Sequence, residues 1–305
     1  MTAAVTALGV TARRVMLHYN AMLRLLLATL LVLGPLPACA EARLKAVATF
    51  SILADFVAEV GGDKVDVSAI VGPDTDVHTY QPRPRDARLL AAARVLASNG
   101  LGFEGWLDRL AEAASFKGQR IVASAGVPGG TDPHCWQDVS CARRYVANIA
   151  DGLASADPAN AAFYRARAAA YDSRLAALDA WIRTEIAGVP SDRRKAITGH
   201  DSFEYFARAY GVRFAAPRGY NSDSEPTARD MATLIREVRA QKIKALFVEN
   251  LTNPNLIDEI ARDSGAAVGP RLYSDALSRP DGPAPTYDAM MRYNVAALVA
   301  GMKKN

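Results

Sequence analysis

Short apolar segments alternate with helix-like segments along most of this 305-residue chain. In the first half the strand-like segments are 44–49, 67–71, 95–98 and 120–124, and helix-like stretches such as 51–60, 84–93 and 103–114 lie between them. The second half repeats the pattern, with strand-like segments 195–198, 212–214, 245–248 and 267–272 and helix-like segments 202–210, 227–241 and 255–264. This alternation predicts an α/β fold with two lobes, each a mainly parallel β-sheet covered by helices.

The segment between the two halves has a different pattern. Asp157 and Pro158 form a favoured helix start. Apolar residues then recur every three or four positions, at Tyr164, Ala168, Tyr171, Leu175, Leu178 and Ile182, until Gly188 and Pro190. The spacing predicts a helix of about 30 residues and about 45 Å. It either packs along one lobe or joins two lobes as a rigid spine, and we favour the spine.

These patterns give a division of the chain into four parts. We expect a signal peptide at 1–40, an N-terminal lobe at 41–156, a linking helix at 157–188 and a C-terminal lobe at 189–305.

The segment 1–40 has the composition of a secretory signal peptide. It contains three arginines, no acidic residue, the apolar run 25–33 and small residues at 38–40 where cleavage would occur. The run is shorter than the roughly 20 residues that a membrane-spanning helix needs. We therefore expect export to the periplasm. The segment 36–39 resembles a lipoprotein box, but Pro37 departs from it, so a lipid anchor at Cys39 is the less favoured alternative.

Charge and cysteine content narrow the class of protein further. Removing the segment 1–40 lowers the formal net charge from +4 to +1, and no Lys/Arg run remains to bind nucleic acid or anionic membranes. Cys135 and Cys141 remain, and an even pair in an oxidising compartment predicts a disulfide that would stiffen the segment beginning at His134. Two free buried thiols are the alternative.

Polar residues with metal-binding side chains stand at the ends of several strand-like segments. His78, His134 and His200 lie in polar loops or directly after such segments, and Asp275 follows 267–272. Ligands of open α/β sheets bind beyond the carboxyl ends of the strands, where these residues would gather. A lone loop histidine is more often structural, however, and these wide spacings carry no metal signature. The residues alone leave a shared site open.

Several blocks of sequence in a fixed order carry a family resemblance. They are VHTYQP at 77–82, DARLL at 86–90, SNGLGFEGWLD at 98–108, DPHCW at 132–136, TGHDSFEYFARAYG at 198–211, LFVE at 246–249 and YDAMMRYN at 287–294. Over nearly its whole mature length, the chain resembles the metal-binding solute receptors of ABC transporters, known as cluster 9 or cluster A-I. The resemblance implies two lobes joined by a long helix, and one metal ligand from each of four blocks, which here are His78, His134, His200 and Asp275.

Ligand chemistry then points to the metal. Three imidazoles and one carboxylate suit Zn²⁺ in a closed four-coordinate site, whereas manganese-selective members of the family typically have a carboxylate at the position of His200. We therefore expect a receptor that delivers Zn²⁺, as cargo, to the permease and ATPase of an ABC importer. A receptor for manganese or another divalent metal, and an adhesin or metal-buffering protein of the same fold, are the alternatives.

An enzyme is not expected. The sequence has no H-E-x-x-H pair, and four protein ligands leave no open position for an activated water. Glu249 and Asp201 are read as bases or, equally, as partners that orient a ligand histidine. The chain lacks the histidine-rich loop of many zinc receptors in the family, so the ion would come from solution or from a periplasmic zinc chaperone. We expect a monomer.

Overall fold

The computed structural model describes residues 42–127, 130–220, 226–251 and 253–305, and residues 43–305 form one compact unit. The predicted signal peptide at 1–40, with Cys39, lies outside the described residues. Within the described part of the chain, no helix is both long and apolar enough to cross a membrane.

The first sheet is parallel and has the strand order β2-β1-β3-β4. Its strands are β1 (Leu44–Phe50), β2 (Val65–Val71), β3 (Val95–Ser98) and β4 (Gln119–Val122). Helices α2 (Ser51–Gly61), α3 (Pro84–Ala91) and α4 (Leu107–Ala113) lie between these strands in the chain. The central strand β1 is buried along almost its whole length, as expected for a parallel strand covered on both faces. The α/β prediction is confirmed.

The second sheet is smaller than predicted. Its regular strands are β5 (Lys195–Ile197) and β6 (Arg213–Ala215), which pair in parallel. The predicted strands 245–248 and 267–272 form only isolated parallel bridges within the described residues, including Ile197 with Leu246 and Glu249 with Leu272. The segment 245–248 exchanges two backbone hydrogen bonds with Ile197, while the amide of Ala245 donates to Oδ1 of Asn305, so the pairing with β5 stays short. Helices α7 (Glu204–Tyr210), α8 (Ala228–Ala240) and α9 (Asn255–Ser264) complete this part of the molecule.

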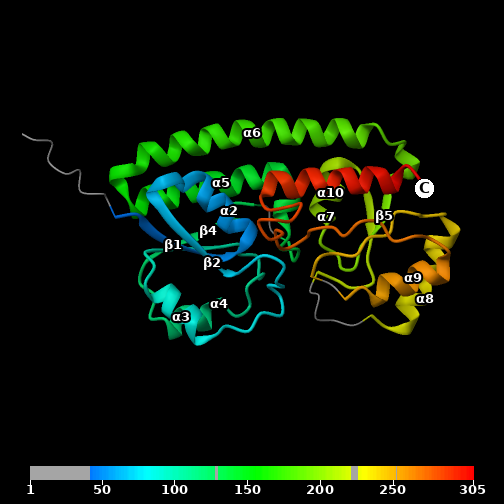
Figure 1. Ribbon diagram of the computed structural model, residues 1–305, viewed down its shortest axis with the longest axis horizontal. Coiled ribbons are helices and arrows are strands. Elements are labelled where there is room, and N and C mark those ends of the chain that lie inside the picture. Colours follow the sequence, from blue (N-terminus) through cyan, green and yellow to red (C-terminus); the bar gives the residue numbers. More distant parts are fainter. Residues whose placement is uncertain (1–41, 128–129, 221–225, 252) are drawn as a thin grey trace, which may run out of the picture. The chain divides into compact units, whose positions relative to one another are not determined.

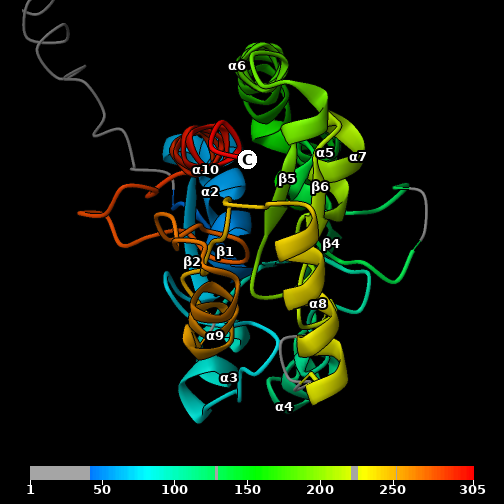
Figure 2. The same ribbon diagram turned by 90° about the vertical axis from the view of Figure 1, so that its right-hand side faces the viewer.

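Three longer helices pack together beside the sheets. They are α5 (Val139–Ala156), α6 (Ala161–Ala187) and α10 (Tyr287–Met302), and α6 packs along both α5 and α10 (Figures 1 and 2). The 27 residues of α6 give a length of about 40 Å. Its predicted apolar stripe, from Tyr164 to Ile182, is buried as expected. The lobe boundaries at 156 and 189 stay a prediction.

The buried apolar residues form two unequal cores. The larger core joins the first sheet, α2, α5 and α6 to residues of α7 and α10. The smaller core lies in the second half and consists of Ile197, Met231, Leu234, Ile235, Val238, Ile243, Leu246, Val248, Ile257, Ile260 and Ala261. Helices α8 and α9 therefore pack around the smaller core, while the second sheet contributes residues to both cores.

Candidate metal centre

The four predicted ligand side chains lie together in the structure. His78 is in the loop after β2, His134 directly precedes the 3-10 turn at Cys135–Gln137, His200 follows β5, and Asp275 lies in the loop before α10. One donor atom from each lies within 4.8 Å of the others. His134 is fully buried, and His200 and Asp275 are 1% exposed.

The separations between donor atoms match those around a small cation. His78 Nε2 lies 3.3 Å from His134 Nε2 and 3.5 Å from Asp275 Oδ2. The other oxygen of Asp275 is 3.5 Å from His134 Nε2, and Oδ2 is 3.1 Å from His200 Nε2. A tetrahedral ion with bonds of about 2.0–2.2 Å holds its ligand atoms about 3.3–3.6 Å apart. Small adjustments of the side chains would bring all four into coordination range.

A buried carboxylate fixes the ring of His134. Asp132 Oδ1 accepts hydrogen bonds from the His134 amide at 2.9 Å and from its Nδ1 at 2.7 Å. With Nδ1 protonated and bound in this way, Nε2 presents its lone pair toward the other ligands. The Asp132-Pro133-His134 turn thus sets both the position and the tautomer of the imidazole.

A carboxylate from a different segment, that of Glu249, orients His200 in the same way. Glu249 follows the bridge-forming segment 245–248, and its Oε1 accepts from the His200 amide at 3.2 Å and lies 3.0 Å from His200 Nδ1. Its Oε2 accepts from the Gly199 amide at 2.7 Å. Glu249 is fully buried, and this contact supports its reading as an orienting partner rather than a base.

Aromatic side chains surround the two histidines of the first half. The ring of Phe103 packs edge-on against His78, with 4.8 Å between the centroids, and Trp136 packs against His134 at 5.3 Å. Phe103 and Trp136 also contact each other at 5.0 Å. This apolar wall lowers the local dielectric constant and strengthens the electrostatic interactions of the site.

The charges of the site depend strongly on one another. Burial alone would lower the pKa of His200, but the carboxylates of Asp275 and Glu249 outweigh burial and hold this pKa well above its ordinary value. Burial would raise the pKa of Asp275, but His200 and His134 hold it well below its ordinary range. Each of these two side chains thus favours the charged form of the other, and a cation that takes Nε2 of His200 as a ligand competes with a proton for that atom.

Two buried polar atoms of this cluster indicate that a cation would fit between the four side chains. Within the described structure, His200 Nε2 and Asp275 Oδ1 make no hydrogen bond of regular geometry, although Nε2 lies 3.1 Å from Oδ2 of Asp275. Buried polar atoms without a partner are costly and uncommon. Both atoms face the other ligands, so a divalent ion bound by all four side chains would satisfy them.

Asp132 was not singled out by sequence reasoning. A signal was present, because His78 and His134 both occur in Asp-x-His turns. In each turn the aspartate accepts a hydrogen bond from the histidine amide, at 2.8 Å for Asp76 and 2.9 Å for Asp132.

Asp201 was considered, together with Glu249, as a base or as a partner that orients a ligand histidine. It is half-buried, and burial raises the pKa of its carboxyl group. Its amide donates to Gly219, within the second half.

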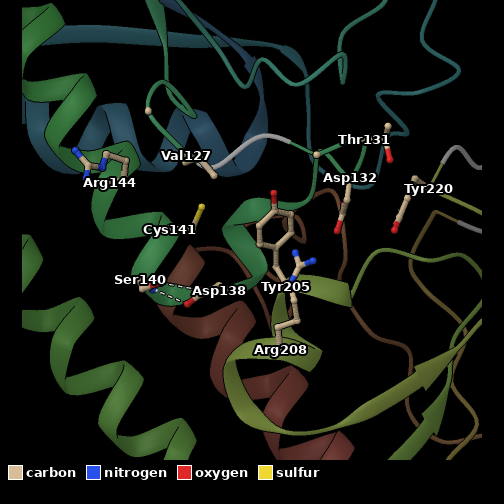
Figure 3. Close-up of a pocket in the computed structure, with 12 residues that line it drawn as sticks. Val127, Thr131, Asp132, Asp138, Ser140, Cys141, Arg144, Tyr205, Arg208 and Tyr220 are labelled. Carbon is tan, nitrogen blue, oxygen red and sulfur yellow. Dashed lines mark hydrogen bonds between the residues drawn. The ribbon is translucent and has the colours of Figure 1, made fainter.

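A cleft of about 610 Å³ lies beside the site (Figure 3). Its lining includes Asp132, Arg144 of α5, Tyr205 and Arg208 of α7, and Tyr220. The cleft thus borders Asp132, which orients His134, and both residues are buried.

The predicted disulfide between Cys135 and Cys141 is present. It links the 3-10 turn that follows His134 to the first turn of α5. The alternative of two free thiols is thereby excluded.

The sequence matches a known protein family over most of its length. The profile of the family described as zinc-uptake complex component A, periplasmic, matches residues 46–301. The chain belongs to this family. Its members are solute-binding receptors of metal ABC transporters and not enzymes, so the chain is the substrate-binding component of such a transporter.

Similar proteins of this family bear the names of different metals. The manganese-binding lipoprotein MntA of Halalkalibacterium halodurans is 33% identical over 267 residues, which cover 86% of this chain and 89% of that protein. The iron-binding protein YfeA of Yersinia pestis is 29% identical, with 87% and 88% covered. The solved structure of the periplasmic zinc-binding protein TroA from Treponema pallidum superposes with a TM-score of 0.81 at 26% identity, with 86% of this chain and 99% of that chain covered.

These names bear on two expectations. Relatives named for manganese, iron and zinc leave a divalent metal, rather than zinc, as the cargo that the comparisons support. Several relatives are named lipoproteins, which reverses the order of preference between an unanchored mature chain and a lipid anchor. The expectation that lipid attachment is the less favoured alternative was therefore wrong, because Pro37 was given too much weight.

Proposed function

We propose that this chain binds one Zn²⁺ through His78, His134, His200 and Asp275 and delivers it to the permease and ATPase of an ABC importer. The observation that carries the proposal is the set of donor separations, 3.1–3.5 Å, among three imidazole nitrogens and one carboxylate. Four donors within 4.8 Å of one another, those of His134, His200 and Asp275 buried and that of His78 half-buried, suit a tetrahedral cargo ion that is enclosed by protein.

The chemistry of the donors favours zinc over manganese. Imidazole nitrogen suits Zn²⁺, whereas Mn²⁺ suits carboxylate, carbonyl and water oxygens in a six-coordinate shell. For a given nitrogen-rich site, affinity also rises from Mn²⁺ to Zn²⁺. Manganese remains the second candidate, because several relatives are named for that metal.

A competition experiment tests the choice of metal. Metal-free protein is incubated with equimolar Zn²⁺ and Mn²⁺, passed through a desalting column and analysed by mass spectrometry for both metals. We expect one zinc per chain and almost no manganese. Retention of manganese in preference would contradict the zinc proposal without contradicting the site.

Ligand substitutions test the site itself. We expect His78→Ala, His134→Ala, His200→Ala and Asp275→Ala each to weaken zinc binding by at least about 100-fold, more than the loss of an orienting partner would. Asp201→Asn, which removes a charge next to His200 but no proposed ligand, is the matched control. Unchanged affinity in all four alanine variants would show that zinc binds elsewhere.

We also propose that the chain is exported and attached to a membrane through a lipid on Cys39. The signal-peptide composition of residues 1–40 and the lipoprotein names of several relatives support this location. Mass spectrometry of the mature N-terminus tests it. A lipid-modified Cys39 is expected, and an unmodified chain that begins near residue 41 would contradict it.

A further inference from the structure

The loop that carries Asp275 is buried although it has no regular secondary structure. All seven residues from 272 to 278 are buried. Buried backbone groups need hydrogen-bond partners. The partners of this loop show which part of the molecule holds Asp275 in place.

The residue before Asp275 is bound to the first half of the chain. The carbonyl oxygen of Ser274 accepts hydrogen bonds from Trp136 Nε1 and from Gln137 Nε2, both at 2.9 Å. Both donors belong to the 3-10 turn that directly follows the ligand His134. One turn therefore positions two of the four proposed ligands.

The residues after Asp275 are bound to the first half as well. The Leu277 amide donates to Ser51 Oγ at 3.0 Å, and the Leu277 carbonyl accepts from the Asp74 amide at 3.0 Å. Ser51 begins α2, and Asp74 lies in the loop that leads to His78. A contact in the other direction, from Asn250 Nδ2 to the carbonyl of Ala276, is longer, at 3.4 Å.

The earlier part of the loop, by contrast, is bound to the second half. The Leu272 amide donates to Val248, and Asn294 of α10 exchanges two hydrogen bonds with the backbone of Tyr273. Helix α10 itself contributes to the larger core. The change of partner thus occurs between Tyr273 and Ser274.

His200 has a different set of neighbours. Its amide and Nδ1 contact Glu249, and its carbonyl accepts from Thr198 Oγ1 and the Ser202 amide. These residues all belong to the second half. Ile197, three residues before His200, lies in the smaller core that α8 and α9 help to form, while Ala196 and Phe203 pack in the larger core. The hydrogen bonds of His200 itself, however, all go to residues of the second half.

From these contacts we infer that Asp275 stays with His78 and His134 when metal is released, and that His200 is the ligand that withdraws. Trp136 and Gln137 act as positioning residues for Asp275. This inference rests on the proposed function in assuming that the four side chains hold the cargo. Although two of the four ligands lie in each half of the sequence, the contacts divide them into three and one.

Amide-resolved hydrogen exchange of the metal-free protein, measured by NMR, tests the anchoring directly. The amides of Asp74 and Leu277 report the contacts of the Asp275 loop, and those of Gly199 and His200 report the contacts with Glu249. We expect protection factors at least about tenfold higher for the first pair, because local opening spares elements held by the larger core. Equal or lower protection of the first pair would overturn the inference.

A substitution cycle tests the role of Trp136 and Gln137 in binding. In a His200→Ala protein, we expect residual zinc affinity that depends on Asp275. Adding Trp136→Phe and Gln137→Met should then weaken zinc binding by about a further tenfold, because two hydrogen bonds to the Asp275 loop are lost.

Tyr287→Phe is the structural control for this cycle. It removes a buried hydrogen bond of 2.7 Å to the Trp136 carbonyl without touching residues 274–277, and should leave zinc affinity unchanged. If the protein with His200→Ala, Trp136→Phe and Gln137→Met binds zinc as tightly as the protein with His200→Ala alone, the inference is overturned. Failure of the unsubstituted protein to retain metal would instead overturn the proposed function, and the exchange measurement would still decide how Asp275 is anchored.

Discussion

Asp132 and Glu249 have the same task at different histidines. Each is buried, and each binds both the amide and Nδ1 of a proposed ligand. The pairing holds the ring in place and makes Nε2 a better donor than a free imidazole.

Glu249→Gln is therefore expected to weaken zinc binding by roughly 10–100-fold. The amide keeps the size of the side chain but gives up the charge that supports the His200 ring. Competition with a chromophoric zinc chelator measures the change.

Asp201→Asn is the matched control for this substitution. It removes the same charge one residue from His200, and its affinity should stay close to that of the unsubstituted protein. Equal losses in both variants would mean that the overall charge near the site, and not the contact with Nδ1, governs affinity.

At the scale of elements, α2 and α10 meet through one carboxylate. Asp55 Oδ2 accepts a hydrogen bond of 2.9 Å from the amide of Tyr287, the first residue of α10. Burial raises the pKa of Asp55 from 3.8 to about 6, despite this hydrogen bond, and neighbouring Glu59 adds to the rise. The folded protein therefore binds a proton here at a pH where the unfolded chain does not.

The pH dependence of stability follows from the sign of this shift. Stability contributed by protonated Asp55 is largest near pH 4 and below, and it is lost as the pH rises through about 6. Asp55→Asn should thus be more stable than the unsubstituted protein at pH 8, by about 1–2 kcal/mol, less than the full linkage because the side chain is half-buried.

Urea unfolding at pH 4.5, 6 and 8, with a chelator present, measures this difference. The advantage of Asp55→Asn should shrink toward pH 4.5. Asp288→Asn, at an exposed carboxylate of α10 that pairs with Arg292, should show no such trend. An advantage independent of pH would argue against titration of Asp55.

The disulfide joins two short elements next to His134. Cys135 and Cys141 are close in sequence, with a separation of 6, so closing this loop is expected to contribute about 2 kcal/mol. Replacing both by serine should lower the free energy of unfolding by that amount but leave one zinc per chain, because Asp132 still holds the His134 ring. Urea unfolding and metal analysis measure the two quantities. Loss of zinc would show that the disulfide, and not Asp132, holds the imidazole ring of His134 in its position.

At the scale of the whole molecule, the proposed ligands come from loops on both cores. A cargo ion would therefore stabilise the full fold and not one element. With free zinc at about 1,000 times Kd, linkage adds about 4 kcal/mol, which raises Tm by roughly 10 °C in a chain of this size. Differential scanning calorimetry measures the shift. His200→Ala should lose most of it, and an equal shift in that variant would contradict binding at this site.

Periodicity predicted much of the fold but not all of it. The apolar stripe of α6 and the strands of the first sheet follow from local patterns, which is why their bounds agree closely with the structure. Helix α5 was not predicted, although Tyr145, Ile149 and Leu153 recur at helical spacing. The second sheet was over-predicted, because an apolar run such as 245–248 does not reveal that its first amide, that of Ala245, donates to the side chain of Asn305.

The site was predictable only in part. Topology places strand ends together, but four ligands from widely separated segments of the chain converge through long-range packing, and the family resemblance was needed to combine them. The attachment of Asp275 to the first half has no local signal at all. It depends on two side chains, Trp136 and Gln137, that reach the carbonyl of Ser274 from the other half of the sequence.

The indole of Trp136 links two of the ligand-bearing segments, since its ring packs on His134 and its Nε1 binds the carbonyl next to Asp275. The emission of Trp136 therefore depends both on the charge of the His134 ring and on the strength of its hydrogen bond to the Ser274 carbonyl. Arrival of a doubly charged ion changes both, so the fluorescence of this tryptophan gives an unlabelled optical signal of cargo occupancy in real time.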